Sequence, residues 1–229
     1  MKLYIEANIG AGKTTFIEKL KKYYANNNSI ICIEEPVDEW LKFKDSNQNN
    51  ILNLFYNDQK RWSYTFQMNA FMTRIETIKK KYSKNKIHFI ERSIYTDKNC
   101  FALIGKENGF ISEIEWKLYN NWFEWLNNKF DVEPSGYIYI KTSPETCYER
   151  IKKRSRREES NIPIEYLQKL STKHEEWLVK NQQNSSVPIL ILDGEKDFEN
   201  DESIFIDYLQ KIDTFYSQIN SNTIISKNI

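Results

Sequence analysis

The chain of 229 residues has little of several things that mark particular classes of protein. It has three cysteines, Cys32, Cys100 and Cys147, which lie far apart without a Cys-x-x-Cys pair, so neither a disulfide scaffold nor a structural zinc site is expected. Its 33 Lys and Arg residues nearly balance its 32 Asp and Glu residues, which leaves a formal net charge of +1. Because no broad positive field is available to hold a nucleic acid polymer, we expect any polyanion that binds to be small.

Long apolar runs and Pro/Gly/Ser-rich linkers are also missing. No apolar segment is long enough to cross a membrane, and the first predicted strand begins at residue 2, which leaves no room for a signal or transit peptide. These absences predict a cytoplasmic protein that does not act at a membrane. With no linker and no internal repeat, the chain is expected to form one α/β domain over residues 1–217, followed by a frayed polar tail over 218–229.

What the chain does have is a phosphate-binding loop close to its start. An apolar run at residues 3–5 predicts a buried strand, residues 10–14 read Gly-Ala-Gly-Lys-Thr, and a helical pattern follows from Phe16. Small residues let backbone N–H groups turn toward phosphate oxygens, and the start of a helix adds positive potential there. Lys13 is then predicted to reach the outer phosphates of a nucleoside triphosphate, and the Thr14 hydroxyl to meet the magnesium ion that the triphosphate carries.

Acidic residues directly follow two of the predicted strands. Five apolar runs supply the strands of a parallel sheet flanked by helices: residues 3–5, 30–33, 86–90, 137–140 and 188–192. Glu35 follows the second run and Glu91 follows the third. Because the carboxyl ends of parallel strands form the ligand-binding edge of an open α/β sheet, both carboxylates should face the same crevice as the phosphate loop. Glu91 suits a group directed at magnesium.

A long predicted helix over residues 62–82 carries two polar side chains within an apolar face. Gln67 and Arg74 are seven residues apart, hence two turns along the same face. Since a buried guanidinium needs a partner, this face is either partly wet or lines a pocket that hydrogen-bonds something planar. Asp97, which could otherwise serve only as a helix cap, is the predicted partner of Arg74.

A basic cluster lies at the end of the helix that starts at Pro144. Arginines and lysines gather between residues 150 and 157, and Glu158 and Glu159 come directly after them, which argues against a nucleic acid surface. We predict a mobile arginine lid at about residues 150–161, because guanidinium groups can stabilise charge on a transferring phosphoryl group.

A strongly aromatic helix is predicted over residues 112–129. It contains Trp116, Tyr119, Trp122, Phe123 and Trp125. So many large rings serve either core packing or a homodimer interface.

Together these motifs resemble the deoxynucleoside kinase family, and most closely its deoxycytidine and deoxyguanosine kinase branch. The resemblance extends from Tyr4 to about Phe198. It is carried by residues 5–14, 35–40, 61–67, 91–97, 143–147, 162–167 and 173–177 and by the arginine lid. It implies a P-loop kinase fold, a homodimer through the helix at 112–129, and transfer of the γ-phosphoryl group of ATP, with Mg²⁺, to the 5′-hydroxyl of a deoxynucleoside.

The resemblance also implies roles for individual residues. Glu35 would remove the proton of the 5′-hydroxyl, Arg92 would orient Glu35 and steady the phosphoryl group, and Glu91 would join Thr14 at the magnesium ion. Glu91 stays a second candidate for the base. The implied ATP-binding residues are Asn8, Ile9, Gly10, Ala11, Gly12, Lys13, Thr14, Thr15, Arg150, Arg154, Arg156, Asp197 and Phe198. The implied substrate-binding residues are Glu35, Trp40, Tyr56, Phe66, Gln67, Arg74, Arg92, Asp97, Phe101 and Glu159.

Within the substrate set, the resemblance places Tyr56 and Glu159 at the sugar, Phe66 and Phe101 on the two faces of the base, and Gln67 at its edge. An aspartate acceptor at position 97 suits the exocyclic amine of cytosine but meets the carbonyl of thymine with like polarity. The neighbouring Arg74 crowds the space that a 5-methyl group needs. We therefore predict that deoxycytidine and purine deoxynucleosides are favoured over thymidine.

Three positions depart from the family pattern: Ala7 replaces the first loop glycine, Asn69 a commonly larger residue, and Lys98 an arginine. Ala7 is tolerable if its φ is negative. Two other readings remain open. A nucleoside monophosphate kinase would share the loop and the lid but would need an arginine for the acceptor phosphate, and a nucleotide-binding subunit without turnover would rest on Ala7 alone.

Overall fold

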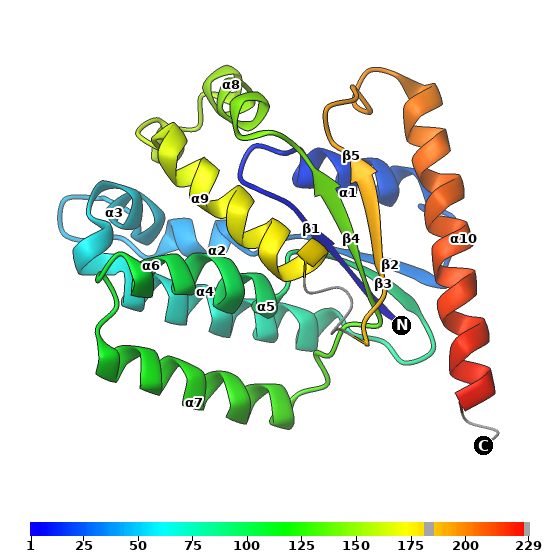
Figure 1. Cartoon of the computed structure of the whole chain (residues 1–229), viewed down its shortest axis with the longest axis horizontal. Coiled ribbons are helices and arrows are strands. Elements are labelled where there is room, and N and C mark those ends of the chain that lie inside the picture. Colours follow the sequence, from blue (N-terminus) through cyan, green and yellow to red (C-terminus); the bar gives the residue numbers. More distant parts are fainter. Residues whose placement is uncertain (181–185, 227–229) are drawn as a thin grey trace.

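The structure, a computed structural model, describes residues 1–180 and 186–226 and is built on a five-stranded parallel sheet (Figure 1). The strand order is β2-β3-β1-β4-β5, with the buried strand β1 (Lys2–Glu6) in the centre. The other strands are β2 (Ile30–Ile33), β3 (Ile87–Glu91), β4 (Gly136–Lys141) and β5 (Ile189–Asp193). The predicted α/β fold with a five-stranded parallel sheet flanked by helices is therefore confirmed.

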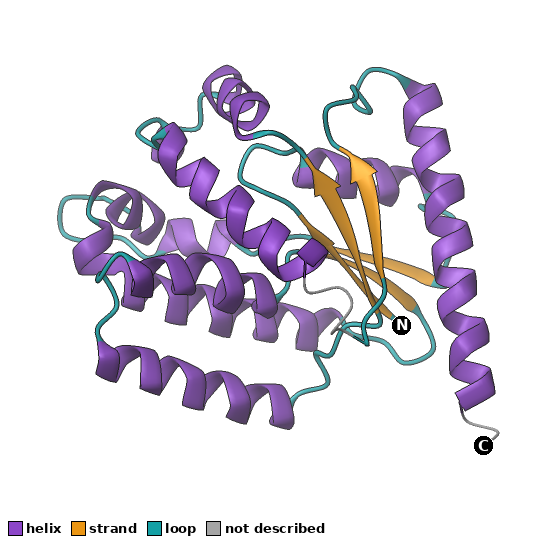
Figure 2. Ribbon diagram, in the orientation of Figure 1, coloured by secondary structure: helices purple, strands orange, loops and turns teal. Residues whose placement is uncertain are grey.

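Helices cover both faces of the sheet (Figure 2). In Figure 1, α10 lies on one side of the sheet and α4, α5, α7 and α9 lie on the other. The α-helices are α1 (Lys13–Tyr23), α2 (Val37–Lys42), α3 (Ile51–Asn57), α4 (Gln59–Lys81), α5 (Ile94–Thr96), α6 (Leu103–Glu107), α7 (Glu113–Lys129), α8 (Pro144–Arg154), α9 (Ile164–His174) and α10 (Glu202–Ser226). A 3₁₀ turn spans Arg157–Glu159, and π-helical stretches span Asp97–Ala102 and Glu175–Lys180.

Several helix starts follow from local capping residues. The side chain of Asp58 accepts a hydrogen bond from the amide of Arg61 at the start of α4, and Ser143 precedes Pro144 at the start of α8. Ser112 and Glu115 form a capping box at the start of α7. These caps fix the helices close to the boundaries that the sequence predicts.

The end of the chain corrects one prediction. The frayed tail expected at 218–229 is wrong for residues 218–226, because α10 continues to Ser226; residues 227–229 lie outside the described residues. Ile219 extends the inward stripe of Ile212 and Phe215, and all three are buried. A Cβ on Gly136 would lie 2.9 Å from Ile219, so the absence of a side chain on β4 makes room for the longer helix.

The backbone of the phosphate loop adopts a conformation that requires glycine at two positions. Gly10 and Gly12 adopt φ values of +79° and +93°, in the left-handed region that favours glycine. Ala7 does not have a positive φ, which meets the condition for an alanine at this place, and it is fully buried. In the described ranges, no helix is both long and apolar enough to span a membrane.

Candidate active site

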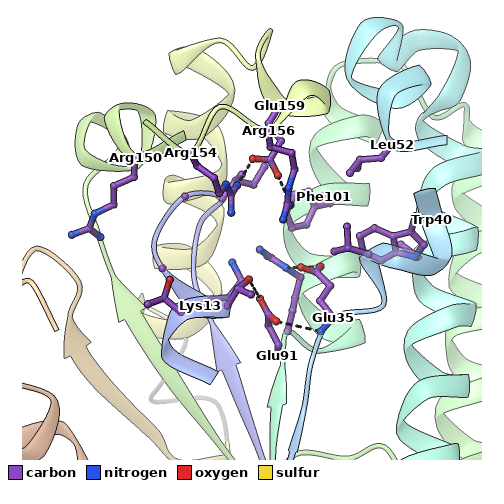
Figure 3. A pocket seen from close by; sticks show the side chains of 18 of the residues that line it. Lys13, Glu35, Trp40, Leu52, Glu91, Phe101, Arg150, Arg154, Arg156 and Glu159 are labelled. Carbon is purple, nitrogen blue, oxygen red and sulfur yellow. Dashed lines mark hydrogen bonds and ion pairs between the residues drawn. The ribbon is translucent and has the colours of Figure 1, made fainter. Parts of the chain in front are cut away.

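A cavity of about 600 Å³ lies at the carboxyl edge of the sheet (Figure 3). This volume is within the range of small-molecule sites. Every predicted substrate-binding residue lines the cavity, and so does every predicted ATP-binding residue except Asn8 and Ala11. The fold thus brings together side chains that are spread from the first loop to the loop after β5.

The loop shapes a buried position for the Lys13 ammonium group. Its Nζ donates to the carbonyl of Asn8 at 2.9 Å and to that of Ala7 at 3.3 Å. Burial first, and then the charge of Arg92, lower the pKa of Lys13 to about 7. The Asn8 side chain accepts from the amide of Ile9 at 2.8 Å and donates to the carbonyl of Leu167 at 2.9 Å, so it holds the loop against α9 instead of lining the cavity.

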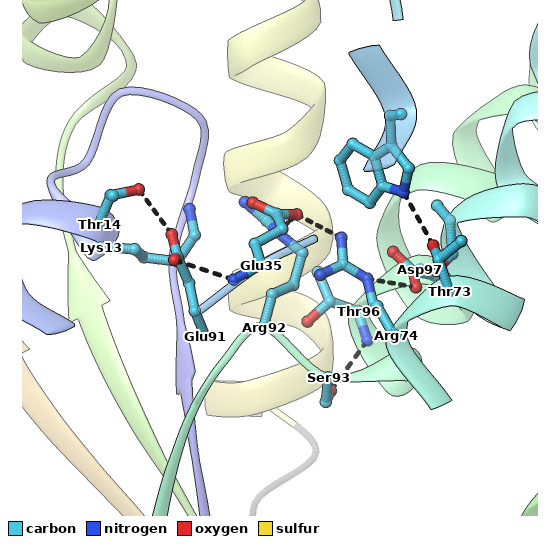
Figure 4. Close-up of polar contacts among 12 residues, drawn as sticks. Lys13, Thr14, Glu35, Thr73, Arg74, Glu91, Arg92, Ser93, Thr96 and Asp97 are labelled. Carbon is cyan, nitrogen blue, oxygen red and sulfur yellow. Dashed lines mark hydrogen bonds and ion pairs between the residues drawn. The ribbon is translucent and has the colours of Figure 1, made fainter. Parts of the chain in front are cut away.

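Glu91 and Thr14 meet at the end of β3 (Figure 4). The Thr14 hydroxyl donates to Glu91 Oε1 at 2.7 Å, and the amide of Glu35 donates to Glu91 Oε2 at 3.2 Å. Burial and the nearby charge of Glu35 raise the pKa of Glu91. A hydroxyl and a carboxylate side by side, next to a phosphate loop, are oxygen ligands that suit magnesium, which takes its remaining ligands from phosphate and water.

Glu35 lies within reach of two guanidinium groups. Its Oε1 pairs with Arg74 Nη2 and lies 3.4 Å from Arg92 Nε. Burial would raise the pKa of Glu35, but the charges of Arg74 and Arg92 outweigh burial and lower it. The two carboxylates are therefore distinguished by their surroundings, with Glu35 held ionised and Glu91 harder to ionise.

Arg74 and Asp97 form the buried pair that the sequence predicts. Arg74 Nε donates to Asp97 Oδ2 at 2.8 Å, and both side chains are almost completely buried. Burial raises the pKa of Asp97 to about 6, although Arg74 opposes the shift. The additional contact of Arg74 with Glu35 is not foreseen from the sequence.

The adjacent wall of the cavity is aromatic. Trp40 packs edge-on against Phe66 and lies beneath the Arg74 guanidinium, and Phe101 lies beneath that of Arg92. Within the described part of the chain, Gln67 Oε1, Arg74 Nη1 and Arg92 Nη1 are buried without a hydrogen-bond partner. Such unpaired polar atoms next to a cavity are the mark of a site that completes its hydrogen bonds with a ligand.

The lid arginines are engaged by acceptors in the protein. Arg154 and Arg156 both pair with the buried carboxylate of Glu159, while Arg150 donates to the carbonyl of Gly194 at 2.9 Å (Figure 3). Two lysines that sequence reasoning missed, Lys153 and Lys196, also line the cavity. Lys153 directly precedes Arg154 and Lys196 directly precedes Asp197, so their places next to predicted ATP-binding residues could have indicated them.

The loop after β5 closes the donor end. Phe198 lies over the phosphate loop, where a Cβ on Gly12 would come within 2.9 Å of its ring. Phe198 also packs edge-on against Phe16 of α1 at 5.4 Å between ring centroids. Gly12 is therefore required both for its φ and for the closeness of this ring.

Comparison with known proteins assigns the chain to a family. The deoxynucleoside kinase family model matches residues 3–220. A probable deoxycytidine kinase of Fowlpox virus is 39% identical, with 95% of this chain and 89% of the relative covered. The human deoxycytidine kinase is 37% identical (87% and 85% covered), and a mitochondrial deoxyguanosine kinase of Xenopus laevis is 34% identical (88% and 84% covered).

Proposed function

The chain belongs to the deoxynucleoside kinase family, and on this premise we propose that it transfers the γ-phosphoryl group of ATP, or of another nucleoside triphosphate, to the 5′-hydroxyl of a deoxynucleoside. One observation carries the proposal: a single cavity has a phosphate loop at one end, an aromatic and amide-lined pocket at the other, and a carboxylate between them (Figure 3). Lys13 marks the first end, Trp40 the second, and Glu35 lies between.

Glu35 is the proposed base. As the 5′-oxygen forms its bond to the γ-phosphorus, the bond from that phosphorus to the leaving oxygen breaks and the hydroxyl proton passes to Glu35. The low pKa of Glu35 keeps it ionised, so that it can accept a hydrogen bond from the hydroxyl before transfer. Arg92, 3.4 Å away, orients the carboxylate, and its unpaired Nη1 is available for the phosphoryl group.

Thr14 and Glu91 are the proposed magnesium ligands, since their oxygens meet beside the phosphate loop. When bound, the ion would neutralise charge on the donor phosphates. Arg154 and Arg156 would contribute further positive charge from the lid. In this assignment Glu91, with its raised pKa and its contact to Thr14, serves the phosphate end and Glu35 the acceptor end.

The base pocket is proposed to favour deoxycytidine and purine deoxynucleosides over thymidine. Gln67 presents an unpaired amide oxygen, and Asp97 presents a carboxylate already held by Arg74. These acceptors suit an exocyclic amine, whereas the 4-carbonyl of thymine would leave a buried acceptor facing another acceptor. Mispairing of this kind is penalised more heavily than one extra methyl group.

We also propose that two copies associate through α7. Its buried face holds Tyr119, Phe123 and Leu126. On its other face Ile114, Leu118, Trp122 and Trp125 are 63%, 43%, 43% and 51% exposed, at three- and four-residue spacing. A contiguous apolar face with two exposed tryptophans is typical of a protein interface.

The direct test is a phosphotransfer panel with ATP and magnesium that offers deoxycytidine, deoxyadenosine, deoxyguanosine, thymidine and deoxycytidine monophosphate. We expect monophosphate formation from the first three and poor turnover of thymidine. Turnover of the monophosphate alone would establish a nucleoside monophosphate kinase instead. ATP binding without product from any acceptor would favour a non-catalytic subunit, although the ordinary backbone of Ala7 gives no structural reason for one.

A further inference from the structure

A fully buried carboxylate, Glu6, lies beneath the proposed catalytic groups and is not itself one of them. Glu6 is the last residue of β1 and is 0% exposed. Ile5 pairs with Glu91 across the sheet and accepts a hydrogen bond from the amide of Arg92 at 3.0 Å, so Glu6 lies where β3 leaves the sheet. A buried carboxylate is costly unless it is hydrogen-bonded, so its partners indicate its role.

The hydrogen bonds to Glu6 come from the turn that follows Arg92. Its Oε1 accepts from the amide of Ser93 at 3.0 Å, and its Oε2 accepts from the hydroxyl of Thr96. The hydroxyl of Ser93 in turn accepts from the amide of Tyr95 at 3.2 Å and from that of Thr96 at 3.3 Å, which caps α5. Figure 4 shows Ser93 and Thr96 side by side. Glu6 thus ties the first and last residues of this turn to the central strand.

The turn needs such an anchor because Arg92 adopts a strained backbone. Its φ is +62°, in the left-handed region that a long side chain rarely enters and that costs of order 1–3 kcal/mol. Strain of this kind persists only when surrounding contacts fix it. This conformation directs the guanidinium over the ring of Phe101, at 4.8 Å, and toward Glu35.

We propose that Glu6 is a positioning residue for phosphoryl transfer, which holds the 93–96 turn and thereby sets the place of Arg92 against Glu35. The inference rests on the proposed function. Glu6 also leads directly into the phosphate loop, since the next residue, Ala7, accepts a hydrogen bond from Lys13 Nζ. One side chain therefore links the donor loop to the arginine of the acceptor side, where displacement by about 1 Å can cost on the order of 10² in rate.

The test compares Glu6→Gln with a matched control on the same strand. Glutamine has nearly the same size and can still accept from Ser93, but it loses the charge and presents N–H groups to the Thr96 hydroxyl. Tyr4→Phe removes a buried hydrogen bond, from the Tyr4 hydroxyl to the carbonyl of Val132 at 2.7 Å, two residues earlier on the same face. The control therefore lowers stability without touching the turn.

We expect kcat of Glu6→Gln to fall about 10- to 100-fold with both KM values changed less than about threefold, and kcat of Tyr4→Phe to stay within about twofold of wild type. In an Arg92→Lys background, Glu6→Gln should lower kcat by less than a further factor of about two, because both substitutions act through the guanidinium of Arg92. Independent, multiplying losses, or an equal loss in Tyr4→Phe, would overturn the proposal.

A second pair of variants covers the case in which Glu6→Gln does not fold. Thr96→Val removes the hydroxyl donor and should lower kcat in the same way, whereas Thr96→Ser keeps the hydroxyl and should restore it; equal kcat in the two would count against the proposal. Hydrogen exchange at the Ser93 amide should quicken in Glu6→Gln, because an uncharged acceptor holds this amide less strongly than a carboxylate does, but not in Tyr4→Phe; unchanged exchange would refute the anchoring. Absence of wild-type turnover on every deoxynucleoside would instead refute the proposed function, independently of the exchange result.

Discussion

Lowering the pH should relax the discrimination against thymidine. The group responsible is Asp97, whose pKa burial raises to about 6, so that its carboxyl changes protonation state within the range in which the enzyme can be assayed. When ionised, Asp97 can only accept hydrogen bonds; when protonated, it has one donor, which suits the 4-carbonyl of thymine.

The magnitude follows from this pKa. At pH 7 about one tenth of Asp97 is protonated, and at pH 5 about nine tenths. If thymidine is accepted only by the protonated form and deoxycytidine only by the ionised form, kcat/KM for thymidine rises about tenfold between pH 7 and pH 5, and kcat/KM for deoxycytidine falls about tenfold. The ratio of kcat/KM for thymidine to that for deoxycytidine should therefore rise by about 10- to 100-fold between pH 7 and pH 5.

The assay is competitive phosphorylation of the two nucleosides in one reaction, at half-unit steps of pH. Use of the ratio cancels pH effects on ATP, on Glu35 and on the fraction of folded enzyme. Asp97→Asn is the matched control, because its amide carries a donor at every pH, and it should give a flat ratio. A flat ratio in the wild type, or an equal slope in Asp97→Asn, would refute the assignment of Asp97 to the base.

Three further outcomes are expected. Glu35→Gln should lower kcat about 10²- to 10⁴-fold while ATP still binds, whereas Glu91→Gln should mainly raise the magnesium concentration needed for turnover; the reverse pattern would make Glu91 the base. Trp125→Glu should shift sedimentation at micromolar concentration from dimer to monomer, and a monomeric wild type would refute the α7 interface. Ile219→Ala should lower the free energy of unfolding by about 2 kcal/mol, measured in urea, whereas Ile206→Ala, at a 37% exposed position, should have little effect.

Much of the site could be predicted because its residues follow regular elements. Glu91 is the last residue of β3 and Glu35 lies two residues after β2, and the geometry of parallel sheets brings such positions to one edge. Arg74 and Asp97 could be paired because a buried guanidinium requires an acid, and Asp97 otherwise had no predicted role beyond capping a helix. The α/β fold follows from the same alternation of apolar runs and helical patterns.

What could not be predicted depends on three-dimensional placement over long sequence separations. Glu6 has the sequence context of any strand residue, and its partners lie 87 and 90 residues away. The continuation of α10 beyond residue 217 could not be predicted for a different reason. Ile219 follows Phe215 at helical spacing, but its burial depends on the glycine at position 136 of β4.

The contact between Arg74 and Glu35 joins the two halves of the site. One nitrogen of Arg74 holds Asp97, the proposed reader of the base, while another holds Glu35, the proposed base of the reaction. A buried carboxylate keeps its partners because an unpaired charge there is costly, so a change at Asp97 alters how strongly Arg74 binds Glu35. The absolute kcat of Asp97→Asn therefore reflects both the altered recognition of the base and the altered contact between Arg74 and Glu35. The ratio of kcat/KM for two nucleosides in the same enzyme isolates the recognition of the base, because the effect on Glu35 is common to both.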